Sequence, residues 1–181
     1  MRRLLDRVGG AVSKVQVSWN LRRLDAQGLT VLDIDNTLAD TWPTLTRPWP
    51  SERARLRAVE PLAGMKAAAY DTAVARGDRI LFLSHRNWWE WPLTLRWLRR
   101  AGFGAAPSSL VLVSDAADKL AHLRRCVAVA VDGVTYWDDL SHSHEHGEAV
   151  FYEGVINEVR ALGLTYHGYD EIAAVVSPRA D

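Results

Sequence analysis

The chain of 181 residues lacks the features that mark several classes of protein. It has a single cysteine, Cys126, so it cannot form an internal disulfide, which is typical of a reducing compartment. No run approaches the roughly 20 apolar residues that span a bilayer, and residues 1–10 contain no apolar segment of a secretion signal. Lysine plus arginine and aspartate plus glutamate both total 22, so no net charge draws the molecule toward nucleic acid or a membrane. We therefore expect a cytoplasmic protein, with any nucleic-acid binding confined to a local patch.

Apolar runs and helical patterns alternate along the chain, and this alternation predicts the fold. Short β-prone runs bounded by glycine or polar residues predict buried strands at residues 30–34, 79–83, 109–114 and 134–137, with a short segment at 165–166. Helical spacing of apolar residues predicts helices within 1–28 and at about 51–57, 61–75, 90–100, 150–162 and 170–175. This order predicts an α/β protein with a three-layer α/β/α, Rossmann-like parallel sheet.

Two stretches depart from the plain alternation. Residues 115–133 keep helical spacing, although 127–131 alone would pass for a strand; we favour a helix first and a turn at Asp132-Gly133. Residues 39–60 are predicted to form a small cap insertion, in which prolines prevent a regular helix over 40–50 and Ser51 begins a short helix. We expect one domain over residues 1–181 that carries this minimal cap.

Carboxylates follow two of the predicted strands. In extended backbone alternate side chains share a face, so Asp33 and Asp35 emerge on the same side, roughly 6.5 Å apart. Like charges at this spacing repel unless a cation lies between them or one is protonated. The pair Asp138-Asp139 closes the strand at 134–137 and lies at the same edge of a parallel sheet. Such an oxygen-rich site suits Mg²⁺.

Other polar residues at this edge complete a pocket for a phosphoryl group. Ser84 supplies a hydroxyl after the strand at 79–83, and Lys119 supplies a cation. The set resembles the four motifs of the haloacid dehalogenase (HAD) superfamily of aspartate-dependent phosphohydrolases, namely Asp33-Ile34-Asp35-Asn36-Thr37, Ser84, Lys119 and Asp138-Asp139. Asn36 stands where the family often has glycine, and asparagine tolerates the unusual dihedrals often needed there.

The resemblance implies the catalytic roles. Asp33 would be the nucleophile that forms an aspartyl phosphate, and Asp35 the general acid that protonates the leaving oxygen and then activates water. Lys119 would neutralise the phosphoryl group and position Asp33. This division agrees with phosphoryl-transfer chemistry, which depends mostly on positioning and charge neutralisation.

The resemblance also implies the phosphate and metal ligands. The residues expected to bind the substrate phosphate are Thr37, Ser84, Arg86 and Lys119. The Mg²⁺ ligands would be Asp33, Asp35 through its backbone, and one or both of Asp138 and Asp139. Asp132 also follows an apolar run and remains an alternative acid for the last motif.

Substrate preference is expected to depend on loops, because no full cap domain fits after the first or second motif. The Ser84-x-Arg86 element with the acidic pair looks like the phosphatase domain of phage polynucleotide kinases. Candidate substrate contacts are His85, Trp42 and Trp88, since tryptophan faces can stack on bases; packing onto the sheet is the alternative for the helix tryptophans. Arginines 96, 99, 100, 124 and 125 would form a basic footprint only if they shared a face.

The sequence thus predicts a Mg²⁺-dependent phosphatase acting on a phosphorylated small molecule, a nucleotide or a nucleic-acid end, with no membrane partner and the oligomeric state left open. The alternative is a catalytically silent phosphate- or nucleotide-binding module on the same fold. His142, His144 and His146 could hold a second metal, but a polar loop at the rim of the site is the simpler interpretation.

Overall fold

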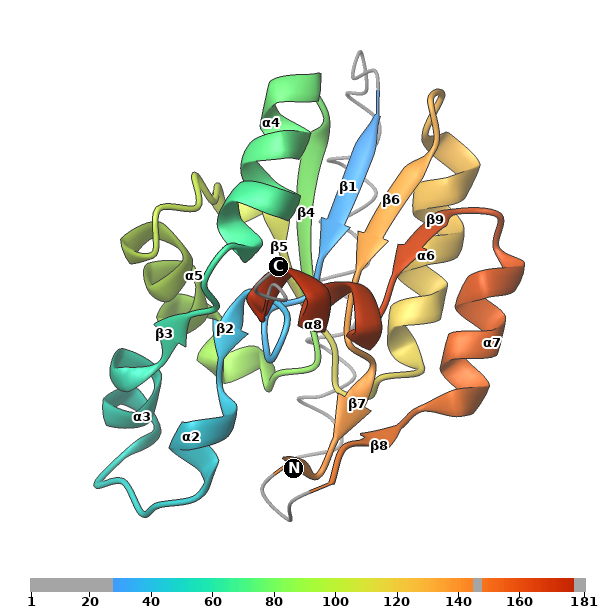
Figure 1. Ribbon diagram of the computed structural model, residues 1–181. Helices are drawn as coiled ribbons and strands as arrows, with labels where there is room; N and C mark the ends of the chain where they lie inside the picture. Colours follow the sequence, from blue (N-terminus) through green and yellow to red (C-terminus); the bar gives the residue numbers. More distant parts are fainter. Residues whose placement is uncertain (1–27, 145–147, 178–181) are drawn as a thin grey trace.

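A computed structural model describes residues 28–144 and 148–177 of the chain (Figure 1). Its main sheet has five parallel strands in the order β5-β4-β1-β6-β9. The strands are β1 (Leu29–Leu32), β4 (Arg79–Ser84), β5 (Leu110–Leu112), β6 (Val134–Trp137) and β9 (Thr165–His167). The central β1 pairs with β4 on one side and β6 on the other. All four predicted strands are present, the short segment expected at 165–166 forms the fifth strand β9, and the predicted parallel sheet is confirmed.

Helices cover both faces of this sheet. They are α3 (Glu52–Ala58), α4 (Thr72–Arg76), α5 (Trp91–Arg100), α6 (Asp118–Val129), α7 (Glu153–Ala161) and α8 (Tyr169–Val176). Shorter helical turns are Lys66–Asp71, of the π type, Trp88–Glu90 and Pro107–Ser109. Among the described residues, no helix is both long and apolar enough to cross a membrane.

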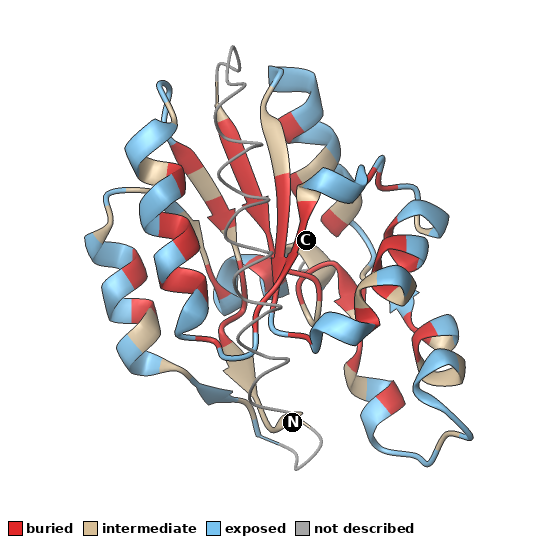
Figure 2. Cartoon of the chain, turned by 180° about the vertical axis from the view of Figure 1, so that it is seen from behind, coloured by how far each residue is buried: buried red, intermediate tan, exposed pale blue. Residues whose placement is uncertain are grey.

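The two faces of β1 enter two separate apolar clusters. Leu32 packs in a cluster with residues of α3, α5 and α8, whereas Val31 packs in a cluster with residues of α6 and α7. Successive residues of a strand point to opposite faces, so the two side chains enter different clusters. Both are fully buried because helices cover both faces. Figure 2 shows this buried centre along the strands, with the exposed residues on the outer sides of the helices. The three-layer α/β/α prediction is confirmed.

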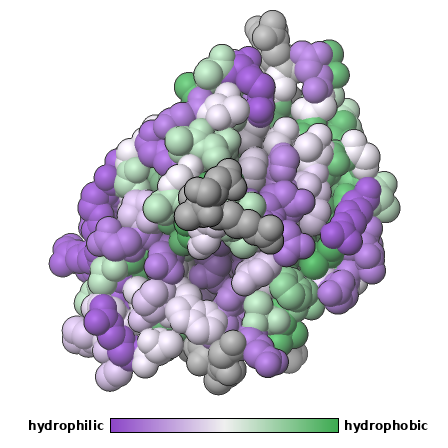
Figure 3. All heavy atoms as spheres, viewed as in Figure 1, coloured by the Kyte–Doolittle hydropathy of each residue, from purple (hydrophilic) through white to green (hydrophobic). Residues whose placement is uncertain are grey.

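The arginines of α5 and α6 do not form one basic footprint, because these helices enter opposite clusters. Arg96, Arg99 and Arg100 are exposed on α5, on the flank that Figure 3 shows as hydrophilic. Arg124 on α6 pairs with Glu158 on α7. Both sets are solvated helix surface.

The predicted cap segment folds as a small unit beside the sheet. Its ends, β2 (Ala39–Asp40) and β3 (Glu60–Pro61), pair antiparallel, and α2 (Trp42–Leu45) and α3 lie between them. The expectation of no regular helix over residues 40–50 is wrong for α2, because Pro43 occupies the first turn, where a missing N–H costs nothing. Ser51 caps α3 as predicted, accepting a hydrogen bond from the Ala54 amide at 3.2 Å.

The ends of two strands and the starts of two helices differ from the prediction. β1 ends at Leu32 instead of residue 34, and β5 ends at Leu112 instead of residue 114. The helix expected from Pro61 begins at Lys66, because a turn with Gly64 at φ +82° comes first. The helix expected from Val150 begins at Glu153, because β8 (Val150–Phe151) pairs with β7 (Ser141–His142). Residues 115–133, where helix and strand were both possible, are helical from Asp118 to Val129 in α6, and the chain turns before β6 as expected. The helix predicted within residues 1–28 lies almost wholly outside the described residues.

Candidate active site

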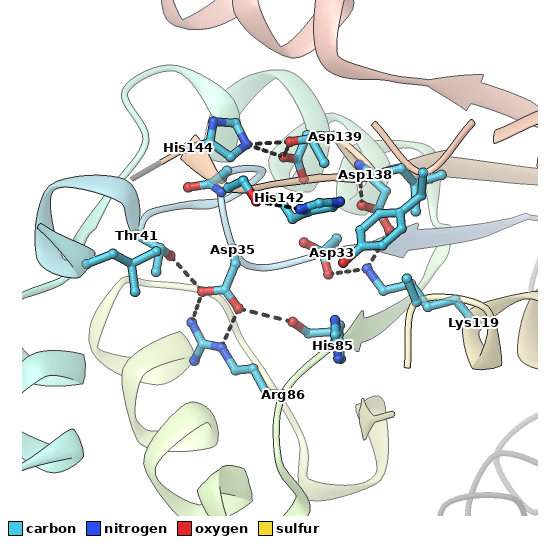
Figure 4. Close-up of a pocket in the computed structure, with 18 of the residues that line it drawn as sticks. Asp33, Asp35, Thr41, His85, Arg86, Lys119, Asp138, Asp139, His142 and His144 are labelled. Atoms are coloured by element: carbon cyan, nitrogen blue, oxygen red, sulfur yellow. Dashed lines mark hydrogen bonds and ion pairs between the residues drawn. The ribbon is translucent and has the colours of Figure 1, made fainter. Parts of the chain in front are cut away.

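A cavity of about 390 Å³ opens at the carboxyl ends of β1, β4 and β6 (Figure 4). The turn after β1 builds one wall: the Ile34 carbonyl accepts hydrogen bonds from the amides of Leu38 (2.9 Å) and Ala39 (2.8 Å). This tight turn places Asn36 at φ +56°, so the expectation that Asn36 adopts an unusual dihedral is confirmed. Asp33 and Asp35, on either side of Ile34, both line the cavity.

Lys119 at the start of α6 joins two carboxylates. Its Nζ donates to Asp33 Oδ1 at 2.8 Å and to Asp138 Oδ2 at 2.6 Å, and all three side chains are buried. Burial opposes the charged form of Lys119, but the two carboxylates raise its pKa overall. Burial also raises the pKa of Asp33; Lys119 opposes this effect, and the charge of Asp138 adds to it. The ammonium is therefore permanently charged and shared by carboxylates that repel each other.

Asp138 is held from several directions. Its Oδ2 accepts a hydrogen bond from the Tyr136 hydroxyl as well as from Lys119, and its Oδ1 accepts one from the Leu140 amide at 2.9 Å. Burial, with the nearby charge of Asp138, raises the pKa of Tyr136 well above its ordinary value, so the phenol stays a donor. These three hydrogen-bond donors fix the Asp138 carboxylate in place.

Asp139 points toward the hairpin that follows β6. Its Oδ2 accepts a hydrogen bond from Ser141 Oγ and lies 3.4 Å from His144 Nε2. Its backbone amide donates to Thr37 Oγ1 at 3.2 Å. Burial raises the pKa of Asp139, and the hydrogen bond from His144 opposes that rise. Asp139 thus has fewer strong fixed partners than Asp138.

Three buried carboxylates could hold a cation together. Ligand oxygens of Asp33, Asp138 and Asp139 lie within 4.8 Å of one another. One ammonium, that of Lys119, is shared by the first two and does not balance three carboxylates. Hard oxygen donors with excess negative charge suit Mg²⁺ or a similar divalent cation. The donor set therefore fits a divalent metal.

Asp35 has a different set of partners. Arg86 Nε donates to its Oδ2 and Arg86 Nη2 to its Oδ1, each at 2.6 Å, while Thr41 Oγ1 donates to Oδ1 at 2.6 Å and Ser84 Oγ to Oδ2 at 3.4 Å. Figure 4 shows the carboxylate between Thr41 and Arg86. Burial would raise the pKa of Asp35, but the charge and hydrogen bonds of Arg86 lower it to about 2. Asp35 is a carboxylate at neutral pH.

Comparison with known proteins bears on the fold. No protein-family model matches the sequence, and no curated protein matches it either. The chain is similar to the solved class C acid phosphatase from Bacillus anthracis, with a TM-score of 0.50 and 19% identity over 75% of this chain and 61% of that one. It is also similar to that enzyme with tungstate bound, with a TM-score of 0.54 and 16% identity over 100% of this chain and 85% of that one. The chain has a HAD-like fold.

The chain spans 61% of the length of the first of these neighbouring structures, which is the longer protein. At these identities the likeness concerns the arrangement of strands and helices.

The structure brings all of the predicted catalytic and metal residues to the cavity. The predicted site residues that line it are Asp33, Asp35, Ser84, His85, Arg86, Lys119, Asp138 and Asp139. Asp35, predicted to bind the metal through its backbone, has its side chain bound to Arg86 and apart from the carboxylate cluster. Arg86, predicted to bind the substrate phosphate, contacts Asp35 and also Thr94 Oγ1 at 3.1 Å.

Other predicted residues are not part of the cavity lining. Thr37 is fully buried with its hydroxyl toward the Asp139 amide. Trp42 packs edge to face on His144, with ring centroids 5.2 Å apart, and Trp88 is 41% exposed and packs on Trp89. Asp132 precedes β6 and lines a different cavity at the opposite end of the sheet, so it lies far from the site.

The histidine segment forms part of the rim, as the simpler interpretation expected. His142 and His144 line the cavity, and His142 packs on Tyr152 with ring centroids 4.7 Å apart. Among the described residues, the group that could hold a metal contains aspartates and neither of these histidines. His146 lies outside the described residues.

Sequence reasoning missed three residues of the site. Tyr136 could have been found, because it lies two positions before Asp138 on a strand and so shares its face. Thr41 and Arg55 lie in the cap segment, and no periodicity or motif marks them as neighbours of Asp35.

Proposed function

We propose that the chain is a phosphomonoester hydrolase that uses Asp33 as nucleophile and a divalent cation, with Mg²⁺ as the expected ion. The observation that carries the proposal is the buried cluster in which Lys119 holds Asp33 beside Asp138 and Asp139 at the cavity floor. The HAD-like fold supports it, since the structural neighbours are acid phosphatases and one was solved with tungstate, an oxyanion that resembles phosphate in shape.

Asp33 would attack the phosphorus of the bound ester. A new bond forms between a carboxylate oxygen and phosphorus, the bond from phosphorus to the leaving oxygen breaks, and that oxygen takes up a proton. Water then attacks the phosphorus of the aspartyl phosphate, and the bond to Asp33 breaks to release phosphate. The 2.8 Å contact with Lys119 orients the Asp33 carboxylate and neutralises charge that accumulates beside it.

Asp35 is suited to the proton transfers by its place at the cavity wall. Its carboxylate is deprotonated at neutral pH, as a base requires, but a pKa of about 2 makes it a weak base. To act first as the acid it must bind a proton, which the approach of a phosphoryl dianion favours by like charge and which Arg86 opposes. The strength of the Arg86 contact therefore sets the balance between the two roles.

Asp33, Asp138 and Asp139 would hold the cation, which when bound supplies positive charge to the transferring phosphoryl group. Asp139 is the stronger candidate of the acidic pair for a direct ligand, because the oxygens of Asp138 already accept hydrogen bonds from Lys119, Tyr136 and the Leu140 amide.

A second candidate, a phosphate-binding module without turnover, is favoured by one observation. The intended acid, Asp35, is locked as an ion pair with Arg86 in this structure. A binding module would retain the cavity and its cations without needing that acid.

Turnover separates the two candidates. The wild-type protein with Mg²⁺ should hydrolyse p-nitrophenyl phosphate, and Asp33→Asn should abolish turnover while tungstate binding, followed by calorimetry, persists. Asp132→Asn is the matched control, since this exposed aspartate lies at the opposite end of the sheet and should behave like wild type. Tungstate binding without hydrolysis by the wild type would favour the binding module.

The finer substrate remains a prediction. Nucleotides and nucleic-acid ends, the likeness to polynucleotide kinase phosphatases and a cytoplasmic location are supported by sequence patterns. Of the proposed stacking residues, Trp42 packs on His144 of the cavity lining, whereas Trp88 packs on Trp89 outside it. A panel of nucleoside monophosphates and oligonucleotide 3′-phosphates, assayed at two salt concentrations, would test it.

A further inference from the structure

Arg55 brings a cation from the cap segment to the cavity. It lies on α3, its side chain is 16% exposed, and it lines the same cavity as Asp33 and Asp35. Its charge reaches the site, since it contributes to the lowered pKa of Asp35. Nothing in the phosphate-transfer roles argued above uses Arg55.

The other strong cations of the cavity wall are already committed to carboxylates. Lys119 is shared by Asp33 and Asp138, and Arg86 holds Asp35 through two hydrogen bonds. Both are buried, with side chains 4% exposed. Arg55 differs because its carboxylate partner, Glu52, is 41% exposed.

The contacts of Arg55 hold its guanidinium beside the cavity, while its carboxylate partner can be replaced by another anion. Its Nη1 donates to Thr44 Oγ1 at 3.3 Å, which anchors the guanidinium beside the cavity. Its Nε and Nη2 donate to Glu52, and an ion pair whose carboxylate is this exposed contributes little to stability. An anionic group of a ligand could replace Glu52 at little cost and accept the same two hydrogen bonds.

A hydrogen-bond chain also links this residue to the catalytic wall. Thr44 Oγ1 donates to the Thr41 carbonyl at 2.6 Å, and Thr41 Oγ1 donates to Asp35. Both threonines are buried, so the cap segment is joined rigidly to the site and Arg55 lies at a fixed place relative to Asp35.

We propose that Arg55 is a specificity residue that binds a second anionic group, a carboxylate or a second phosphate, on the leaving-group side of the substrate. The substrate class is then a phosphomonoester whose alcohol part is itself anionic. This inference rests on the proposed phosphatase function, because it assigns the leaving group to the cap side of the cavity.

Three aryl phosphates test this proposal. Phenyl phosphate carries no second charge, 4-carboxyphenyl phosphate adds a carboxylate, and 1,4-phenylene bisphosphate adds a phosphate. Dissociation constants are measured by calorimetry with Mg²⁺ in an Asp33→Asn background, and kcat/KM is measured in proteins that retain Asp33. The last two compounds separate the two sources of the anion.

Arg55→Gln should reduce the preference for the doubly anionic compounds over phenyl phosphate by about ten- to a hundredfold, the value of a charge-assisted hydrogen bond. Glu52→Gln should increase that preference severalfold, because it removes the competing carboxylate. Arg53→Gln, on the exposed side of the same helix, is the control and should leave the preference unchanged.

An unchanged preference in Arg55→Gln would overturn the proposal. So would an equal loss for all three compounds in both Arg55→Gln and Thr44→Val, accompanied by a shifted pH profile, because that pattern assigns Arg55 to the positioning of Asp35. Failure of the proposed function is separate: it appears as no hydrolysis by the wild type, whereas the binding preference still reports on Arg55.

Discussion

The ion pair between Asp35 and Arg86 predicts a specific acid sensitivity of the fold. Arg86→Gln removes both charge-assisted hydrogen bonds to Asp35 and leaves the carboxylate with Thr41 and Ser84 as partners. Because Asp35 is 27% exposed and Arg86 is 4% exposed, solvent compensates only part of this loss. The pKa of Asp35 should rise to or above its ordinary value.

The magnitude follows from linkage between protonation and folding. Arg86 and the hydrogen bonds lower the pKa of Asp35 from 3.8 to about 2, a difference of nearly two units. At 1.36 kcal/mol per unit, the ionised carboxylate stabilises the folded state by about 2 kcal/mol. Because the folded-state pKa is the lower one, this stabilisation is complete above about pH 4 and is lost as the pH falls toward 2.

Urea unfolding at a series of pH values measures the effect. At pH 7, Arg86→Gln should lower the free energy of unfolding by about 2 kcal/mol, and its stability should fall less steeply than that of the wild type between pH 4 and 2. NMR titration of the Asp35 carboxyl carbon should show the change in pKa directly. A double-mutant cycle with Asp35→Asn should return a coupling energy of about 2 kcal/mol.

Two results would refute the reasoning. One is an Asp35 carboxyl that titrates near its ordinary value in the wild type, and the other is a coupling energy below about 0.5 kcal/mol, the error expected for independent sites. Arg86→Lys serves as the matched variant, since a single ammonium keeps the charge but cannot reproduce both hydrogen bonds of the guanidinium.

Three further outcomes are expected around the carboxylate cluster. Lys119→Met should cost about 3 to 5 kcal/mol in urea unfolding at pH 7, because it leaves Asp33 and Asp138 buried without their cation. The loss should shrink toward acid pH, since the raised pKa of Asp33 favours its neutral form in the folded state. Asp139→Asn should weaken Mg²⁺ binding by about tenfold or more in calorimetry. Tyr136→Phe should lower the melting temperature through loss of about 1 kcal/mol, as its hydroxyl donates to Asp138.

The fold was predictable because its signals are local. A short apolar run with β-branched residues, bounded by glycine and aspartate, favours a buried strand, and alternation with helices favours a parallel sheet. The same topology brought Asp33 and Asp35 to one cavity, since parallel strands end at one edge of the sheet. Strand alternation does not reach them, because β1 ends at Leu32, and the Asp35 carboxylate binds Arg86 apart from the cluster around Asp33.

The partners within the site were not predictable by these arguments. Arg86 holds Asp35 across 51 positions of the chain, and the pattern around Arg86 indicates only that it follows a strand end. The helix at Trp42–Leu45 was not predicted, because a proline breaks a helix in its interior but is tolerated in the first turn, where Pro43 lies. Arg55 depends on how the whole cap segment lies against the sheet, which its own residues do not encode as a periodic pattern.

Charge balance connects the metal and the second-anion proposals. The cavity carries the four aspartates Asp33, Asp35, Asp138 and Asp139, to which Lys119 and Arg86 are bound. When all are ionised, these six groups have an excess of about two negative charges. A divalent cation would neutralise that excess, and a phosphoryl dianion would then restore it. A substrate with a second anionic group would add to the repulsion unless a further cation bound that group. Arg55 is placed for that task, and its exposed partner Glu52 leaves it free to exchange. If the site takes doubly anionic substrates, high salt should therefore weaken their binding more than the binding of a simple phosphate ester. The reason is that the contact of the second anion with Arg55 is more exposed than the contacts of the phosphoryl group at the cavity floor.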